Sequence, residues 1–222
     1  MCGRTRLVAK PREVQVAFGL SEEPSLVPSW NVAPSEAIAV VRTPGELEQL
    51  RFGWIPSFSP EPKLRWVNAR AETVAKQSAF REAFRKRRCL VVVDGFYEWK
   101  TDADSKRKQP YLVTLADGGP FALAGIWERW ESKATGEVVD SCAIITERAR
   151  PPLDVLHDRQ PVILRPEDYA AWLDPATQDA ERLLAGGRTD ELVMRAVSAV
   201  VSDARNKGPE CNEPPASGPD GA

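Results

Sequence analysis

The sequence lacks the residue patterns that mark metal-binding and disulfide-rich proteins. It has one histidine, His157, and its four cysteines stand far apart, without a C-x-x-C pair, at positions 2, 89, 142 and 211. This spacing excludes a disulfide-dense scaffold and leaves no plausible zinc shell, so we expect neither a metal site nor a cofactor. Free thiols in a reducing cytoplasm are the simplest interpretation.

Long apolar runs and an excess of charge are also missing. No run of about 18 apolar residues is present, which predicts that no helix crosses a membrane. The basic N-terminus is not followed by a hydrophobic region, so we expect no secretory signal and a cytoplasmic location. Because the formal net charge is −2, any binding to nucleic acid requires a local basic surface.

What is present is the patterning of an ordinary globular domain. Helical spacing predicts helices over residues 11–20, 71–88, 166–173 and 176–185. Alternating or β-branched runs predict strands over residues 37–42, 48–54, 90–93, 96–100, 111–115, 121–127, 141–146, 161–164 and 192–201. Loops are expected over residues 29–35, 101–109 and 132–137.

These elements indicate one α+β domain over residues 1–207. Its core is expected to be a mainly antiparallel, barrel-like β-sheet flanked by helices, and nothing suggests more than a monomer. Residues 208–222 are rich in proline, glycine and polar residues, which predicts a disordered C-terminal tail.

Cys2 follows the initiator methionine and is small enough for Met1 to be removed by the usual aminopeptidase. The exposed residue would then carry an amine and a thiol on adjacent carbons. Such a 1,2-aminothiol condenses with an aldehyde to an imine, and the thiol then closes a five-membered thiazolidine ring. A cysteine at this position would mean nothing in most proteins, so it needs partners to be informative.

Two other residues are candidates for proton transfer. Alternation in D-G-F-Y-E-W-K places Phe96 and Glu98 on one face of a strand and Tyr97 and Trp99 on the other. An acid among aromatics is a candidate for a raised pKa, with a salt bridge as the alternative. His157 stands at an element boundary in L-H-D-R-Q-P, where functional residues often lie, although a lone histidine is more often a packing residue.

Five motifs together resemble a known family. They are M-C-G-R at the start, W-N-V-A-P at residues 30–34, N-A-R-A-E-T at 68–73, D-G-F-Y-E-W-K at 94–100 and L-H-D-R-Q-P at 156–161. In this order they resemble the SOS-response-associated peptidase (SRAP) family of abasic-site processing proteins. The resemblance covers nearly the whole chain, from Cys2 to about Lys207.

The resemblance implies a role for each matching residue. Cys2 would form a thiazolidine with the ring-opened sugar of an abasic site, and Asn68 would contact that sugar. Glu98 would move protons, and His157 would help to open the deoxyribose ring. Arg70 would hold a phosphate and Thr146 would complete the pocket.

Apart from the resemblance, the basic residues Arg4 and Arg159 beside the motifs suit a groove for single-stranded DNA, and Pro34 is assigned to the same surface. Trp30, Trp54, Trp66 or Trp99 could stack on neighbouring bases, although core packing is the more common role of any one tryptophan.

Some positions depart from the family pattern. Arg148 stands where relatives have a small residue, and Asp203 and Ala204 stand where asparagine-type residues are expected, which puts a binding role for the late segment in doubt. A nucleoid-associated location in a bacterium is the expected setting. The resemblance leaves recruitment by replication-fork proteins open.

Three other functions remain open at the level of sequence. The chain is also consistent with a cysteine peptidase that removes its own Met1, with Cys2, His157 and Glu98 as nucleophile, base and orienting residue. An amidohydrolase with Cys2 as N-terminal nucleophile is a second alternative, and a DNA-binding module without chemistry is a third. The basic residues beside the site have no obvious part in the two hydrolytic alternatives.

Overall fold

Five strands close into a barrel at the centre of the protein. The structure, a computed structural model, describes residues 2–101, 108–185, 187–189 and 191–216. The barrel strands, in their order around the ring, are β3 (Ala37–Val41), β4 (Glu48–Phe52), β10 (Val138–Arg148), β9 (Phe121–Glu131) and β6 (Arg88–Val93). Neighbours are antiparallel except for β4 and β10, which are parallel.

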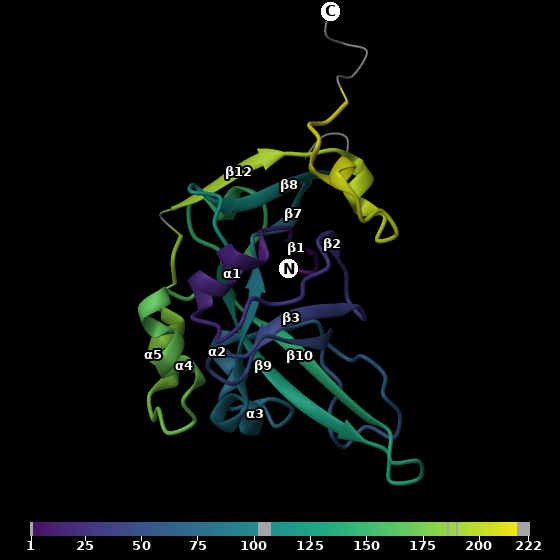
Figure 1. Ribbon diagram of the computed structural model, residues 1–222, viewed down its shortest axis with the longest axis vertical. Helices are drawn as coiled ribbons and strands as arrows, with labels where there is room; N and C mark the ends of the chain where they lie inside the picture. Colours follow the sequence, from purple (N-terminus) through teal and green to yellow (C-terminus); the bar gives the residue numbers. More distant parts are fainter. Residues whose placement is uncertain (1, 102–107, 186, 190, 217–222) are drawn as a thin grey trace, which may run out of the picture.

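A second sheet lies beside the barrel, above it in Figure 1. Its order is β12 (Leu192–Ala196), β8 (Lys108–Leu115), β7 (Gly95–Thr101), β1 (Thr5–Leu7) and β2 (Ser29–Val32). Two short strands, β5 (Asn68–Arg70) and β11 (Arg159–Pro161), pair with the end of β10. The apolar residues inside the barrel form one core with the inner face of the second sheet, and Cys2, Phe52, Val91 and Phe96 all belong to that core.

Short helices cover the outside of the barrel. They are α1 (Pro11–Phe18), α2 (Ala71–Val74), α3 (Arg81–Lys86), α4 (Tyr169–Leu173) and α5 (Ala180–Ala185), with 3-10 turns η1 (Leu153–Val155), η2 (Pro166–Asp168), η3 (Ala199–Ser202) and η4 (Pro209–Asn212). Phe84 of α3 packs edge-on against Trp172 of α4, with ring centroids 5.9 Å apart. The α+β class with a barrel-like, mainly antiparallel core is therefore confirmed.

Three predicted elements differ from the structure, and one of them, the strand expected over residues 192–201, ends at Ala196 and is followed by η3. The helix expected over residues 71–88 is split into α2 and α3, and Arg88 begins β6 because it pairs with Ile126 of β9. Residues 29–32 form β2 rather than a loop because they pair with β1. Tertiary pairing overrides local propensity in both cases. Of the loop expected over residues 101–109, positions 102–107 lie outside the described residues.

The disordered tail was predicted to begin too early. Residues 209–212 form η4, the side chain of Cys211 is fully buried, and the amide of Ser198 donates to the carbonyl of Glu213. The segment is ordered because these contacts with η3 and β2 stabilise it despite its composition. The rest of the expected tail, residues 217–222, lies outside the described residues.

Asp94 anchors the N-terminal strand. Its buried carboxylate accepts hydrogen bonds from the amides of Val8 and Ala9 at 2.6 Å, and from Nε of Arg6 at 2.7 Å. Both charged side chains are at most one-tenth exposed. This contact fixes the strand that leads back to Cys2.

Replacing Asp94 with alanine should therefore destabilise the fold strongly. The variant leaves a buried guanidinium and two amides without their acceptor, and losing one partner of a buried pair costs roughly 3–5 kcal/mol. The free energy of unfolding in urea measures the loss. Asp117→Ala, at an exposed turn, is the control. Equal stability of the two variants would show that Asp94 does not hold the strand.

Candidate functional site

Cys2 lies three residues before β1 and is fully buried in the shared core. Its carbonyl oxygen accepts a hydrogen bond of 3.0 Å from Nδ2 of Asn68, the first residue of β5. Burial raises the pKa of the Cys2 thiol well above its usual range, and the nearby Glu98 carboxylate adds to the effect. The thiol is therefore protonated at neutral pH and needs a base before it can react.

Glu98 is the carboxylate whose charge acts on the Cys2 thiol. It lies on β7 with 4% of its surface exposed, and it follows Phe96, whose side chain packs in the same core as Cys2. Burial raises the Glu98 pKa to about 7. At neutral pH the carboxyl group is thus divided between its two protonation states, and it can accept a proton in one step and return it in another.

The predicted alternation along β7 is confirmed. Phe96 belongs to the core that contains Cys2, whereas Tyr97 lies in a separate cluster, with Trp99 packed against it. The hydroxyl of Tyr97 donates to the carbonyl of Trp30 at 2.7 Å. The strand therefore places Phe96 and Glu98 near Cys2, and Tyr97 and Trp99 near the end of the chain.

His157 lines the same pocket as Glu98. The pocket has a volume of about 600 Å³ and is lined by Glu98, Trp99, Thr101, Lys108, His157 and Ser202. Three of these residues, Glu98, Trp99 and His157, were expected at the site from sequence, and the fold brings Glu98 and His157 together across about 60 positions of the chain. Lys108 and Ser202 were not expected there.

The ring nitrogen Nδ1 of His157 has two neighbours. It lies 3.0 Å from the amide nitrogen of Arg159 and 2.7 Å from the carboxylate of Asp158. A neutral Nδ1 accepts from the amide, whereas a protonated one donates to the carboxylate, so the two bonds belong to different states. Burial lowers the His157 pKa, which favours the neutral ring at pH 7 with its proton on Nε2.

A second pocket includes Asn68 in its lining. It has a volume of about 800 Å³ and is lined by Arg65, Trp66, Val67, Asn68, Arg70, Thr73, Lys76, Gln77, Phe80 and Thr146. The predicted residues Asn68, Arg70 and Thr146 thus share one surface. Thr146 is buried, and its hydroxyl is 3.5 Å from the carbonyl of Ala69, so it supports β5 from behind.

Two residues that were predicted to bind phosphates, Arg4 and Arg159, form hydrogen bonds or ion pairs with other groups of the protein. The guanidinium of Arg4 donates to Oδ1 of Asn31 at 3.0 Å and to the carbonyl of Val201 at 2.8 Å. Arg159 forms a two-pronged ion pair with Glu72, at 2.6 and 2.9 Å. Arg159 is consequently neutralised by its partner, and Arg4 holds the C-terminal segment.

The residues predicted to contact bases differ in how deeply they are buried. Trp54 is fully buried in the core, so the prediction that it stacks on a base is wrong. Trp30 is half-buried, with the guanidinium of Arg6 at 5.6 Å from its ring, and Pro34 is half-buried just after β2. Trp99 lines the pocket of Glu98, and its indole N–H donates to Oγ of Ser202 at 3.0 Å.

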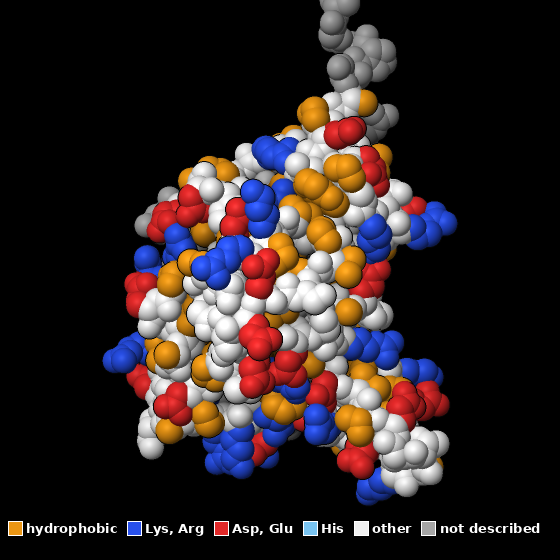
Figure 2. Space-filling view, viewed as in Figure 1, with side chains coloured by type: hydrophobic (Ala, Val, Ile, Leu, Met, Phe, Trp, Pro, Cys, Tyr) orange, Lys and Arg blue, Asp and Glu red, His pale blue; other side chains and the backbone are white. Residues whose placement is uncertain are grey.

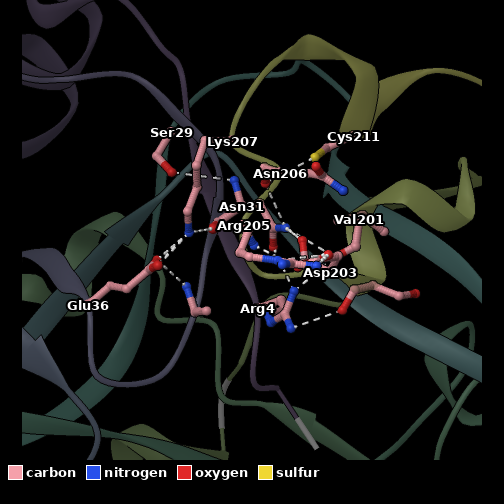
Figure 3. A network of polar contacts seen from close by, with 12 residues as sticks. Arg4, Ser29, Asn31, Glu36, Val201, Asp203, Arg205, Asn206, Lys207 and Cys211 are labelled. Atoms are coloured by element: carbon pink, nitrogen blue, oxygen red, sulfur yellow. Dashed lines mark hydrogen bonds and ion pairs between the residues drawn. The ribbon is translucent and has the colours of Figure 1, made fainter.

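Asn31 ties the N-terminal segment to the end of the chain, which sequence reasoning missed (Figure 3). Its fully buried amide Nδ2 donates to the carbonyl oxygens of Val201, Asp203 and Asn206, at 2.9 to 3.1 Å. Its Oδ1 accepts from Arg4. No sequence signal pairs residues 170 positions apart, although Asn31 itself stands in the W-N-V-A-P motif.

Lys207 closes the same network. Its Nζ donates to the carbonyl of Asn31 at 2.6 Å and to the carboxylate of Glu36 at 2.5 and 2.6 Å (Figure 3). The segment that it holds carries Ser202, which forms part of the pocket wall. The late residues therefore shape the pocket from a distance in sequence.

The surface charge is mixed rather than concentrated. Lys and Arg side chains alternate with Asp and Glu over the face seen in Figure 2. This agrees with the net charge of −2 and means that a basic surface must be local. A larger cavity of about 1050 Å³ lies between α3 and α5 and contains none of the predicted site residues.

Two features that mark other classes of function are absent from the described part of the chain. No group of three or more His, Cys, Asp or Glu side chains in it is arranged to hold a metal ion. No helix in it has the length and apolar character needed to span a membrane.

Comparison with a family model and with known proteins gives one consistent match. The model described as SOS response associated peptidase (SRAP) matches residues 1–204. Abasic site processing protein YoqW of Bacillus subtilis is 34% identical over 96% of this chain and 99% of its own length. Abasic site processing protein YedK of Escherichia coli is 29% identical over 96% of this chain and all of its own length.

A solved structure has the same fold. The crystal structure of a Bacteroides thetaiotaomicron protein superposes with a TM-score of 0.82 at 25% identity, over 94% of this chain and 96% of that one. The described architecture is therefore that of an experimentally observed fold.

Proposed function

Because this chain belongs to the SOS response associated peptidase (SRAP) family, we propose that it processes abasic sites in DNA by covalent capture through Cys2. The relatives named above are abasic site processing proteins, which supports the substrate class. The observation that carries the mechanism is the juxtaposition of an N-terminal cysteine with a buried glutamate whose pKa is about 7. An amine, a thiol and a proton carrier are what aldehyde capture requires.

The reaction begins after removal of Met1. The Cys2 amine adds to C1 of the ring-opened sugar, and loss of one water gives an imine. The thiol sulfur then adds to the same carbon, and its proton ends on the ring nitrogen. One aldehyde and one aminothiol thus give one thiazolidine and one water. The carbon is neither oxidised nor reduced, so no external co-reactant is needed.

Glu98 carries the protons between these steps. As a carboxylate it takes the proton of the buried thiol, whose raised pKa otherwise keeps it unreactive. As a carboxylic acid it protonates the hydroxyl that leaves as water during imine formation. A pKa near 7 allows both roles at neutral pH because neither state is rare.

His157 and Asn68 act on the sugar from two sides. Neutral His157 presents its Nε2 proton in the pocket that it shares with Glu98, where it can assist opening of the deoxyribose ring. Asn68 holds the carbonyl of Cys2 and lines the neighbouring pocket, so it fixes the nucleophile next to the DNA strand. Single-stranded DNA is the proposed substrate because the sugar must reach a buried thiol.

Denaturing gel electrophoresis tests this function directly. The protein is mixed with a single-stranded oligonucleotide bearing one abasic site, and with the same oligonucleotide undamaged as the control. A slower-migrating species that survives denaturation should form only with the abasic strand. If mass spectrometry shows that Met1 is absent and no such species forms, the covalent proposal is wrong and the peptidase alternative takes its place.

A further inference from the structure

We propose that Glu72 and Arg159 form a brace that fixes the tautomer and orientation of His157, so that its Nε2 proton faces the pocket shared with Glu98. The sequence gave no reason to expect a role for Glu72, and it suggested that Arg159 lies in the DNA groove. Both are positioning residues, because they act on the sugar only through His157. This inference rests on the proposed function, in which His157 helps to open the deoxyribose ring.

The carboxylate of Glu72 and the guanidinium of Arg159 pair in a two-pronged geometry. Nη1 of Arg159 lies 2.6 Å from Oε1 of Glu72, and Nη2 lies 2.9 Å from Oε2. A planar, bidentate pair fixes the orientation of both side chains, which a single contact does not. The hydrogen bond from Arg159 lowers the pKa of Glu72, so the carboxylate is charged at neutral pH.

Arg159 also connects the brace to the strand beside the nucleophile. Its Nη2 donates to the carbonyl of Thr146 on β10 at 2.5 Å. Glu72 lies in α2, which follows directly on β5, and β5 begins with the Asn68 that donates to the carbonyl of Cys2. The brace therefore joins the turn of His157 to the segment that holds the nucleophile.

The backbone amide of Arg159 carries the link to the histidine ring. It donates to Nδ1 of His157 at 3.0 Å. A ring nitrogen that accepts a hydrogen bond carries no proton, so the proton of the neutral ring is on Nε2. Nε2 lies across the imidazole from Nδ1, and the ring lines the pocket of Glu98. The position of Arg159 thus decides which nitrogen can donate to the sugar.

Asp158 offers His157 a competing state. Its exposed carboxylate lies 2.7 Å from Nδ1 and accepts a hydrogen bond only if that nitrogen is protonated. Burial, the N-terminal amine, Arg159 and Lys108 all lower the pKa of the ring, whereas Asp158 raises it, and Glu98 lines the same pocket. The ring is therefore neutral at pH 7, and the amide of Arg159 competes with Asp158 for the tautomer.

Magnetic resonance reads this tautomer directly, because the chain has one histidine. The protein is prepared without a histidine tag and with isotope-labelled histidine, and spectra are recorded without DNA at about pH 8, where the ring is neutral. Wild type should show protonated Nε2 and unprotonated Nδ1. Glu72→Ala should show a mixture of both tautomers, because Arg159 loses its anchor and Asp158 then competes.

Glu82→Ala is the matched control. It also removes a glutamate that pairs with basic side chains, Arg85 and Lys86, but on α3 and outside the pocket of His157. Its spectrum should match that of wild type. If Glu72→Ala also keeps the wild-type spectrum, or if wild type itself carries the proton on Nδ1, the brace is wrong.

Rates of covalent capture show whether the brace acts through the ring. With saturating abasic oligonucleotide, Glu72→Ala should be slower than wild type by as much as about 10²-fold, the cost of a misplaced group. In a His157→Ala background the same change should cause no further loss, since its effect passes through that residue. Independent losses that multiply would contradict the inference.

Affinity for an undamaged strand separates the brace from a phosphate contact of Arg159. If Glu72 only screens a phosphate ligand, Glu72→Ala should bind single-stranded DNA more tightly, with an unchanged spectrum and rate. That result would overturn the brace, which predicts unchanged affinity. Fluorescence anisotropy with a labelled oligonucleotide measures it.

The spectra also distinguish this inference from the proposed function, because they require neither DNA nor the chemistry of Cys2. If wild type forms no covalent product, capture is wrong, and the comparison of Glu72→Ala with Glu82→Ala still decides the brace. Thermal melting verifies that each variant is folded. Glu72→Gln, which is nearly isosteric, is the second variant, and its spectrum should shift in the same direction as that of Glu72→Ala.

Discussion

Cys2→Ala should abolish the covalent product with abasic DNA. The change removes the thiol that closes the ring, so any imine formed by the new N-terminal amine stays reversible and is lost on denaturation. The expected loss is complete within detection. The measurement is the denaturing gel described above, with affinity for the undamaged strand measured in parallel.

Two matched variants show which group of Cys2 is required. Cys2→Ser keeps the amine and nearly the same volume in the fully buried site, so it should form an imine that borohydride reduction traps but denaturation without reduction does not. A chain with one residue fused before Cys2 keeps the thiol but lacks the adjacent amine, and it should form no product. Covalent product from this fused chain would contradict the ring mechanism and favour a thiol-only nucleophile, as in the peptidase alternative.

Glu98→Gln should slow capture at pH 7 by about 10²- to 10⁴-fold, the usual contribution of a positioned proton carrier. Glutamine is nearly isosteric, so DNA affinity should be unchanged. The rate is taken from gel time courses under single-turnover conditions with saturating strand. Glu128→Gln is the control. Glu128 is also buried, but it lies on β9, pairs with Arg87 and does not line the pocket of Glu98.

The pH dependence identifies the role of Glu98 more sharply than the rate alone. With a carboxyl pKa of about 7 and ring closure by the thiol as the slow step, the wild-type rate should rise as pH passes through 7, since the carboxylate is the form that deprotonates the thiol. Glu98→Gln should lose that rise and keep only the later one from the N-terminal amine, near pH 8. An unchanged profile in the variant would show that Glu98 does not carry the proton.

The same shift has a consequence for stability. The Glu98 pKa is raised from 4.5 to about 7, so the folded protein binds more protons than the unfolded chain between these values. Stability therefore falls as pH rises through this window, because above pH 7 a charged carboxylate must stay buried. Glu98→Gln should accordingly melt at a higher temperature than wild type at pH 8, with the difference vanishing by pH 4.

Much of the candidate site was predictable from sequence because its residues stand in short local motifs. The alternation of Phe96 and Glu98 with Tyr97 and Trp99 needs only the period of an extended strand. The reactivity proposed for Cys2 depends on its place at the N-terminus, which is a property of the chain alone. His157 could be proposed because no other histidine competes for its role.

The residues expected to bind phosphates or stack on bases were predicted less well. The sequence shows the type of each residue but not whether other parts of the protein bind or bury its side chain. Arg4 and Arg159 are cations by sequence, but only the fold reveals that Asn31 and Glu72 occupy them. Trp54 and Trp66 are the same type of residue, and only packing in the fold buries the first and exposes the second. Burial depends on contacts between distant segments, which no local pattern contains.

The sequence by itself determined the α+β class, the central strands of the barrel, and the residue types available for aldehyde capture, because periodicity and composition are local properties. Only the tertiary structure decided that the barrel closes through the parallel pair of β4 and β10, and that Glu98 and His157 share a pocket with Ser202. It also decided that residues 209–212 fold, against their composition. The physical reason is the same throughout: long-range pairing and burial outweigh local preference wherever distant segments supply the missing partners.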